Sequence, residues 1–294
     1  MKAELADKSG FCFGVSRAVN TVYSEVNKAD GAVYTYGPII HNESVIKDLE
    51  ERGVQAVDTL EEACAISGGT IVVRSHGITK AETDALNNSG LKVADATCPF
   101  VRKIHDLVRS YSDDGYFVVI IGDRSHPEVR GIVGWSKPEM TAVIENAQEA
   151  KALVIPECRG VCVVSQTTFN YNNFQELVEI IRESGYHRID VTADENRFAV
   201  FNTICSATKE RQEAAKELSV RADAMVVIGG KSSSNTRKLY EICCENCKNT
   251  YLVQTRDDLL HSDFSGFDFV GITAGASTPN NIIEEVLEYV RHGQ

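Results

Sequence analysis

Three cysteines stand in similar positions along the chain, and thiol chemistry is the first chemistry that the sequence offers. Cys12, Cys98 and Cys205 each lie just before or at the start of a predicted helix, in G-F-C-F-G-V, A-T-C-P-F-V and T-I-C-S-A-T. A helix N-terminus favours a thiolate, because its unpaired N–H groups and its dipole stabilise negative charge. Three converging thiolates suit a 4Fe-4S cluster with one iron left open to another ligand. The alternative is three buried structural cysteines.

The other six cysteines receive no chemical role. C-x-x-x-C at Cys158 and Cys162, and C-C-x-x-C from Cys243 to Cys247, have spacings like those of metal sites. A single C-x-x-C needs a second pair before it indicates zinc, so we expect core packing or exposed thiols, with an accessory metal site as the alternative. Nine cysteines are also too few for a disulfide scaffold. The six are Cys64, Cys158, Cys162, Cys243, Cys244 and Cys247.

Three of the seven histidines lie in short polar segments that follow apolar runs: His41 in H-N-E, His76 in S-H-G and His126 in S-H-P-E. Together with several hydroxyl and amide side chains they offer hydrogen-bond donors near predicted helix N-termini, which can hold a phosphate or diphosphate. The segment G-G-K-S-S-S-N lacks the spacing of a nucleotide P-loop. Each residue taken alone could be an ordinary surface or core residue. The hydroxyl and amide side chains are Thr167, Ser233, Ser234, Asn235 and Ser277.

Glu128 is the candidate proton donor. It lies two residues beyond His126, and a carboxyl group in a closed polar pocket can keep a proton for transfer to a substrate. The alternative is a solvated loop glutamate, since glutamate is seldom buried.

The elements that must position these residues alternate along the chain. Short β-branched runs end in the polar segments, and helical patterns with apolar residues at i, i+3 and i+4 lie between them. This alternation predicts an α/β fold with parallel-rich sheets, in which ligands gather at the carboxyl ends of the strands. The runs are Thr70–Val73, Phe117–Ile121, Val161–Val164, Met225–Ile228 and Phe269–Thr273.

The three cysteines are separated by about the length of a small α/β unit, so we expect three such units with boundaries near residues 97 and 203. No Pro/Ser-rich linker separates the units, so they should pack closely. Residues 1–97 carry Cys12, His41 and His76. Residues 98–203 carry Cys98, His126, Glu128 and Thr167. Residues 204–294 carry Cys205, Ser233, Asn235, Ser277 and a C-terminal helix.

Composition excludes several classes of protein. With 294 residues and 43% hydrophobic residues the chain can bury a core. A net charge of -12 has the wrong sign for a nucleic-acid partner. The longest apolar runs are strand-sized, so no membrane span is expected. The first ten residues include Glu4 and Asp7 and lack the apolar region of a signal peptide, so we expect a cytoplasmic protein.

Eight motifs, taken in order, resemble those of the LytB-type iron-sulfur reductases, the family of 4-hydroxy-3-methylbut-2-enyl diphosphate reductase. They are G-F-C-F-G-V-x-R-A, H-N, S-H-G, D-A-T-C-P, S-H-P-E, S-Q-T-T, K-x-S-S-N and T-A-G-A-S-x-P. The resemblance implies a trefoil of three α/β units around a central 4Fe-4S cluster. It also implies the last step of the non-mevalonate isoprenoid pathway, in which two electrons and two protons remove the allylic hydroxyl as water. The products are isopentenyl and dimethylallyl diphosphate.

Position by position, the resemblance implies that Cys12, Cys98 and Cys205 are the cluster ligands. Glu128 would deliver the proton, and Thr167 would orient the substrate hydroxyl or pass the proton on. The side chains that would bind the diphosphate are His41, His76, His126, Ser233, Ser234, Asn235 and Ser277. Phe13 departs from the family pattern, where relatives often have a small residue.

No flavin or nicotinamide fingerprint is present, so electrons must come from outside, and the resemblance implies reduced ferredoxin or flavodoxin as the donor. Such donors are acidic, so docking would need a local basic patch. Basic residues that follow the three cysteines could form it, or could simply be solvated helix faces. They are Arg17, Arg102, Lys103, Lys209 and Arg211. The rival functions are another reductive dehydration on an open cluster and a zinc- or thiol-based binding or regulatory protein.

Overall fold

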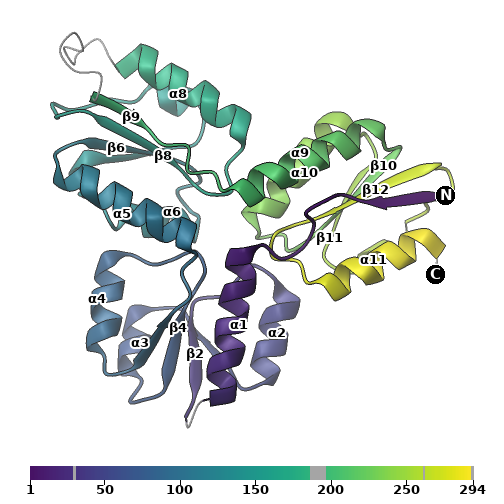
Figure 1. Cartoon of the computed structure of the whole chain (residues 1–294), viewed down its shortest axis with the longest axis horizontal. Coiled ribbons are helices and arrows are strands. Elements are labelled where there is room, and N and C mark those ends of the chain that lie inside the picture. Colours follow the sequence, from purple (N-terminus) through teal and green to yellow (C-terminus); the bar gives the residue numbers. More distant parts are fainter. Residues whose placement is uncertain (29–30, 186–196, 261, 293–294) are drawn as a thin grey trace. The chain divides into compact units, whose positions relative to one another are not determined.

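The computed structural model describes residues 1–28, 31–185, 197–260 and 262–292 (Figure 1). The chain divides into two compact units. We call Met1–Ser16, Ile40–Arg52 and Cys205–Gln294 the terminal unit, and Arg17–Ile39 with Gly53–Ile204 the internal unit.

The terminal unit is built on one parallel four-stranded sheet of order β1-β12-β10-β11. Its inner strands are mostly apolar, because helices cover both faces of the sheet. Figure 1 shows α9 and α10 on one face and α11 on the other. The strands are β1 (Lys2–Leu5), β10 (Ala224–Ile228), β11 (Thr250–Val253) and β12 (Phe269–Ala274). The helices are α2 (Glu43–Glu51), α9 (Ser206–Arg221), α10 (Ser234–Asn246) and α11 (Asn280–His292), with a 3-10 turn at Arg256–Leu259.

The internal unit holds two parallel four-stranded sheets, of which the first has the order β3-β2-β4-β5. Its strands are β2 (Val33–Tyr36), β3 (Gln55–Val57), β4 (Thr70–Val73) and β5 (Lys92–Asp95). The helices with them are α1 (Phe13–Lys28), which begins in the terminal unit, α3 (Leu60–Ala65) and α4 (Lys80–Asn88). Capping boxes start α3 and α4: Thr59 pairs with Glu62, and Thr79 pairs with Glu82.

The second sheet of the internal unit has the order β7-β6-β8-β9. The two inner strands are buried along their whole length, which explains their uninterrupted apolar sequences. The strands are β6 (Phe117–Ile121), β7 (Thr141–Ile144), β8 (Val161–Ser165) and β9 (Phe198–Val200). The helices are α5 (Pro99–Asp113), α6 (Pro127–Val133), α7 (Ala147–Lys151) and α8 (Tyr171–Gly185), with a 3-10 turn at Pro138–Met140.

The predicted α/β class is confirmed, since all three sheets are parallel and four-stranded. One strand does not pair with its neighbours in the sequence. β1 joins the sheet of the C-terminal strands and not the sheet of β2 to β5. The division into 1–97, 98–203 and 204–294 stays a prediction. Among the described residues, no helix combines the length and the apolar character that a membrane span requires.

Candidate active site

Each of the three singled-out cysteines lies directly before the first residue of a helix. Cys12 precedes α1, while Cys98 and Cys205 occupy the N-cap positions of α5 and α9. All three thiols are half-buried, and none is part of a disulfide. The Val15 N–H points at the Cys12 Sγ at 3.5 Å, and the Cys205 Sγ lies 3.0 Å from the Thr208 hydroxyl. All three cysteines thus stand at helix starts, the kind of position that favours negative charge in general.

Cys12 and Cys205 belong to the terminal unit, and Cys98 belongs to the internal unit. Backbone hydrogen bonds fix two of the three cysteines: the Cys12 N–H donates to the Ala276 carbonyl at 3.1 Å, and the Cys98 N–H donates to the Ser75 carbonyl at 2.9 Å. Both Cys12 and Cys205 act electrostatically on Arg211. The convergence of all three thiols on one metal group stays a prediction.

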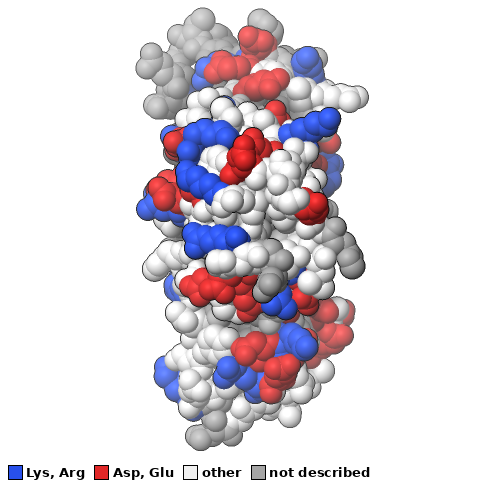
Figure 2. All heavy atoms as spheres, turned by 90° about the vertical axis from the view of Figure 1, so that its right-hand side faces the viewer, with Lys and Arg blue, Asp and Glu red and all other residues white. Residues whose placement is uncertain are grey.

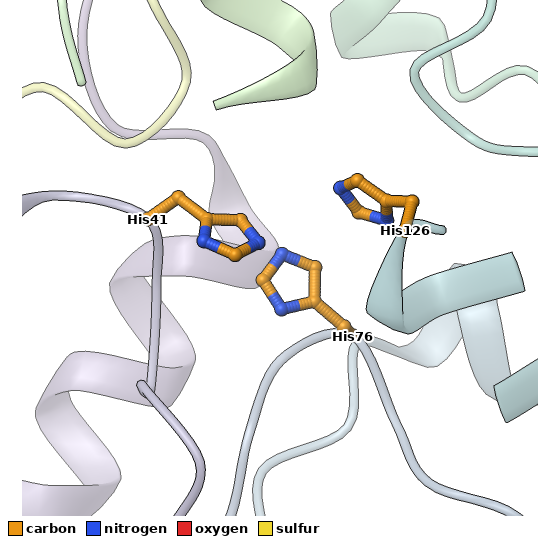
Figure 3. Close-up of side chains that lie close together, drawn as sticks. All are labelled: His41, His76 and His126. Atoms are coloured by element: carbon orange, nitrogen blue, oxygen red, sulfur yellow. The ribbon is translucent and has the colours of Figure 1, made fainter. Parts of the chain in front are cut away.

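His76 and His126 lie side by side within the internal unit, as Figure 3 shows. His76 follows β4 and His126 caps the N-terminus of α6, so the loops of two different sheets bring them together. Their ring centroids are 5.3 Å apart and the rings meet edge to face. The Glu128 N–H donates to the His126 Nδ1 at 3.1 Å. A neutral His126 therefore carries its proton on Nε2 and can present it to a ligand.

Glu128 is buried, with 2% of its surface exposed, so the alternative of a solvated loop residue is wrong. Thr167 holds both carboxylate oxygens: its N–H donates to Oε1 at 2.6 Å and its hydroxyl donates to Oε2 at 2.8 Å. Burial raises the pKa of Glu128 to about 7, although the two hydrogen bonds from Thr167 act in the opposite direction. A substantial fraction of this carboxyl group is therefore protonated at neutral pH, as a proton donor requires.

The remaining polar residues gather in the terminal unit at the carboxyl edge of its sheet. Ser233 follows β10 and caps α10, and its hydroxyl accepts from the Thr236 N–H at 3.3 Å. Ser277 follows β12, and its hydroxyl donates to the His41 carbonyl at 3.1 Å. Asn235 differs from the other members, because it is only 4% exposed and neither its side-chain Nδ2 nor its Oδ1 has a hydrogen-bond partner. A buried amide in this state is suited to a polar ligand. Ser234, another of the predicted ligands, is the first residue of α10.

The basic residues that follow the cysteines are mostly engaged within the protein. Arg211 is 5% exposed, so its expected place in a basic docking patch is wrong. Arg17 donates to the carbonyls of Thr97 and Asp95, and Arg102 pairs with Asp95 at 2.6 Å. The buried residues of α9 fall at Thr208, Arg211, Gln212, Ala215, Leu218 and Ser219. This i, i+3, i+4 spacing is the sequence signal that could have placed Arg211 on the inner face.

The six other cysteines show no sign of a metal site. Cys243 and Cys247 pack in an apolar cluster with Met225 and Leu239. Burial raises the pKa values of the Cys162 and Cys243 thiols to about 12, which keeps both thiols neutral. Within the described part of the chain, no group of three or more potential ligands includes any of these six cysteines. Core packing is therefore the better interpretation of the buried members.

A family model described as "LytB protein" matches residues 3–291 of the chain. A curated relative from Caldanaerobacter subterraneus, named 4-hydroxy-3-methylbut-2-enyl diphosphate reductase, is 43% identical and is matched over 99% of this chain and 97% of its own length. A relative of the same name from Alkaliphilus oremlandii is 40% identical, and the match covers 99% of this chain and all of that protein.

Two solved structures are similar to the chain. The E-1-hydroxy-2-methyl-but-2-enyl-4-diphosphate reductase from Plasmodium falciparum has a TM-score of 0.87 at 28% identity, covering 98% of this chain and 86% of that one. A structure titled as (E)-4-hydroxy-3-methyl-but-2-enyl diphosphate reductase, the terminal enzyme of the non-mevalonate pathway, has a TM-score of 0.67 at 39% identity and covers 99% of both chains. The chain therefore belongs to the LytB protein family and is, like these relatives, a reductase.

Proposed function

We propose that the chain reduces (E)-4-hydroxy-3-methylbut-2-enyl diphosphate to isopentenyl diphosphate and dimethylallyl diphosphate, the last step of the non-mevalonate pathway. The allylic C–O bond breaks, a C–H bond forms, and two electrons and two protons convert the hydroxyl into water. The observation that carries this proposal is Glu128, a buried carboxyl group with a pKa raised to about 7 and held by Thr167. The named relatives support the choice of substrate.

The cysteine thiols fit an iron–sulfur group. Cys12, Cys98 and Cys205 are half-buried, are not consumed in disulfides, and each stands at a helix start, where negative charge is stabilised. Sulfur donors of this kind favour iron–sulfur clusters over hard cations. A 4Fe-4S cluster held by these three residues, with one iron open, would supply the electrons of the reaction.

Diphosphate ligands are proposed in each unit by itself. In the terminal unit, the buried amide of Asn235 lacks a partner, and Ser233 and Ser234 stand at the N-terminus of the 13-residue helix α10. Backbone N–H groups at such a terminus, together with hydroxyl groups, bind phosphate oxygens without needing many cations. In the internal unit, His126 offers the Nε2 proton that its hydrogen bond at Nδ1 leaves in place. His41, His76 and Ser277 are the other proposed diphosphate ligands.

Glu128 would deliver the proton that allows the hydroxyl to leave as water. Its carboxyl group is screened from solvent and is partly protonated at neutral pH, as a general acid should be. Thr167 keeps the carboxyl in one orientation through two hydrogen bonds. For a relay, the protonated Glu128 would donate from Oε2 to the Thr167 hydroxyl oxygen, 2.8 Å away, while the Thr167 O–H donates to the oxygen of the substrate hydroxyl.

We further propose reduced ferredoxin or flavodoxin as the electron donor. On the face shown in Figure 2, basic and acidic side chains are interspersed, so a basic docking patch would be local. Of the basic residues that follow the cysteines, Lys103 and Lys209 are exposed and could contribute to it. Lys209 lies 3.8 Å from Glu213, however, and such an exposed pair is weak.

The test is turnover of the allylic alcohol diphosphate by anaerobically purified protein with a chemical reductant. We expect a brown protein with about four irons and matching sulfide per chain, which forms both diphosphate products. Glu128→Gln should keep the iron but slow turnover about 10²- to 10⁴-fold, the usual worth of a general acid. Glu157→Gln, at an exposed position of the same unit, is the matched control and should leave turnover unchanged. A colourless protein that holds zinc would instead support the thiol-based binding protein.

A further inference from the structure

Arg211 is a buried arginine that joins two cysteine-bearing segments of the terminal unit. It lies in α9, the helix that begins after Cys205, and only 5% of its surface is exposed. One guanidinium nitrogen donates to the Ala207 carbonyl at 2.9 Å, within its own helix. The other donates to the Gly10 carbonyl at 2.6 Å, two residues before Cys12. The guanidinium therefore ties the segment that carries Cys12 to the helix that carries Cys205.

The positive charge of Arg211 has no carboxylate partner among the described ion pairs, and its Nε is buried without a hydrogen-bond partner. Burial lowers the pKa of Arg211, whereas the negative charges of Cys12, Cys205 and Glu210 raise it. Glu210 is exposed and lies 3.9 Å from Lys8. A buried cation needs a counter-charge close by. Once Cys12 and Cys205 bind a metal group as thiolates, they would supply this counter-charge.

The Gly10 carbonyl belongs to a residue with a left-handed backbone conformation. Gly10 has φ +88, and a Cβ at this position would lie 2.9 Å from the Asn280 Oδ1 and 3.0 Å from the Ile283 Cδ1. Two residues further along, the Cys12 N–H donates a hydrogen bond to the Ala276 carbonyl at 3.1 Å. The Gly10–Cys12 backbone is thus held by two hydrogen bonds, one to the Ala276 carbonyl in the loop after β12 and one from Arg211.

Arg17 makes a comparable contact in the internal unit. Its guanidinium donates to the Thr97 carbonyl at 2.9 Å, directly before Cys98, and to the Asp95 carbonyl at 3.1 Å. In both units, then, an arginine from a helix that follows one cysteine holds the backbone just before another cysteine. The planar fork of arginine can serve two carbonyl groups at once, which the single ammonium of lysine cannot do with the same geometry.

We propose that Arg211 is a positioning residue of the sulfur site. Its guanidinium fixes the backbone of Gly10–Cys12 against α9 and supplies the fixed positive charge that balances the Cys12 and Cys205 thiolates. This inference rests on the proposed function for the identity of the group that the thiols hold. It assigns to Arg211 no contact with the substrate and no part in proton transfer.

The first test measures the positioning role by hydrogen exchange of the full-length protein, as isolated and after removal of metal. We expect the backbone amides of Cys12 and Val15 to exchange about tenfold faster in Arg211→Met, because the bond to the Gly10 carbonyl is lost. Arg211→Lys should exchange at an intermediate rate. Lys216→Met removes an exposed charge from the same helix and is the control that should match the parent protein.

The second test measures the charge through the reduction potential of the iron-loaded protein. Reduction adds negative charge, so loss of the nearby cation in Arg211→Met should lower the equilibrium constant for one-electron reduction about tenfold, a shift of about 59 mV to more negative potential. Arg211→Lys should keep the potential close to that of the parent protein, and Lys216→Met should not change it.

The outcomes separate this inference from the proposed function. Unchanged exchange and unchanged potential in an iron-loaded Arg211→Met protein would overturn the inference and leave the function intact. If Arg211→Met does not fold, Arg211→Lys decides: amides of Cys12 and Val15 that exchange at the parental rate would refute the positioning role. A parent protein that binds no iron would refute the function, and the exchange measurement would still decide whether Arg211 holds the Cys12 segment.

Discussion

Replacement of Glu128 by glutamine should change how the stability of the protein depends on pH. Burial raises the pKa of Glu128 from its ordinary 4.5 to about 7, so the folded chain binds this proton more tightly than the unfolded chain does. The stability that the protonated carboxyl contributes is fully present below pH 4.5 and is lost as the pH rises through 7. Glutamine has no such proton, and its amide can still meet the Thr167 N–H and hydroxyl.

The size of the effect follows from the two pKa values. One pKa unit corresponds to 1.36 kcal/mol, so ionising the folded carboxyl costs about 3 kcal/mol once the pH is well above 7. Part of that cost is already present at pH 5, which leaves a change of about 2.5 kcal/mol between pH 5 and pH 8. The free energy of unfolding of Glu128→Gln, relative to the parent protein, should therefore rise by this amount over that range.

The assay is guanidinium chloride unfolding of the metal-free protein at several pH values from 5 to 8, for the parent and the variant. Comparing the two proteins at each pH cancels the titration of all other groups. Glu157→Gln, at an exposed position of the internal unit, should differ from the parent by a constant amount. A difference between Glu128→Gln and the parent that stays flat or falls with rising pH would refute the argument from burial.

Three further predictions concern single residues. Asn235→Leu should weaken the binding of inorganic diphosphate about 10- to 100-fold by calorimetry, because the buried amide would no longer meet its charged partner; unchanged binding would remove Asn235 from the site. Gly77→Ala should lower the free energy of unfolding by more than Gly90→Ala, by about 1–3 kcal/mol. Both positions have positive φ, but only at Gly77 would the new Cβ meet a side chain, the His105 Cε1 at 2.6 Å. Equal effects in thermal melts would contradict this. Cys98→Ser should lower the iron content of anaerobically purified protein, whereas full retention of iron would exclude Cys98 as a ligand.

Much of the fold could be predicted from local patterns. The uninterrupted apolar runs of β6 and β8 predict buried parallel strands, and both strands are fully buried. The pairing of β1 with β12 could not be predicted, because a four-residue strand carries no local information about a partner at the far end of the chain.

Some features of the candidate site could likewise be predicted from the sequence, and others could not. The motifs place the three cysteines at helix starts, and the structure has each of them there. The burial of Glu128 could only be suspected, because it depends on Thr167, which reaches it from another loop. The basic character of Arg211 suggested exposure, although the spacing of its neighbours in α9 pointed to the inner face. Charge alone is thus a poor guide to burial when two backbone carbonyl groups can accept hydrogen bonds from the guanidinium.

The pairing of β1 with β12 bears on the order in which the protein can be made. On the ribosome, Lys2–Leu5 emerges long before its partner Phe269–Ala274. The strands of the internal unit all lie between residues 33 and 200, so that unit can fold while synthesis continues. The segment that carries Cys12 therefore lies outside a finished sheet until Phe269–Ala274 has been made. If Cys12 holds iron as proposed, loading would follow the synthesis of β12, and until then this thiol is open to oxidation in the nascent protein.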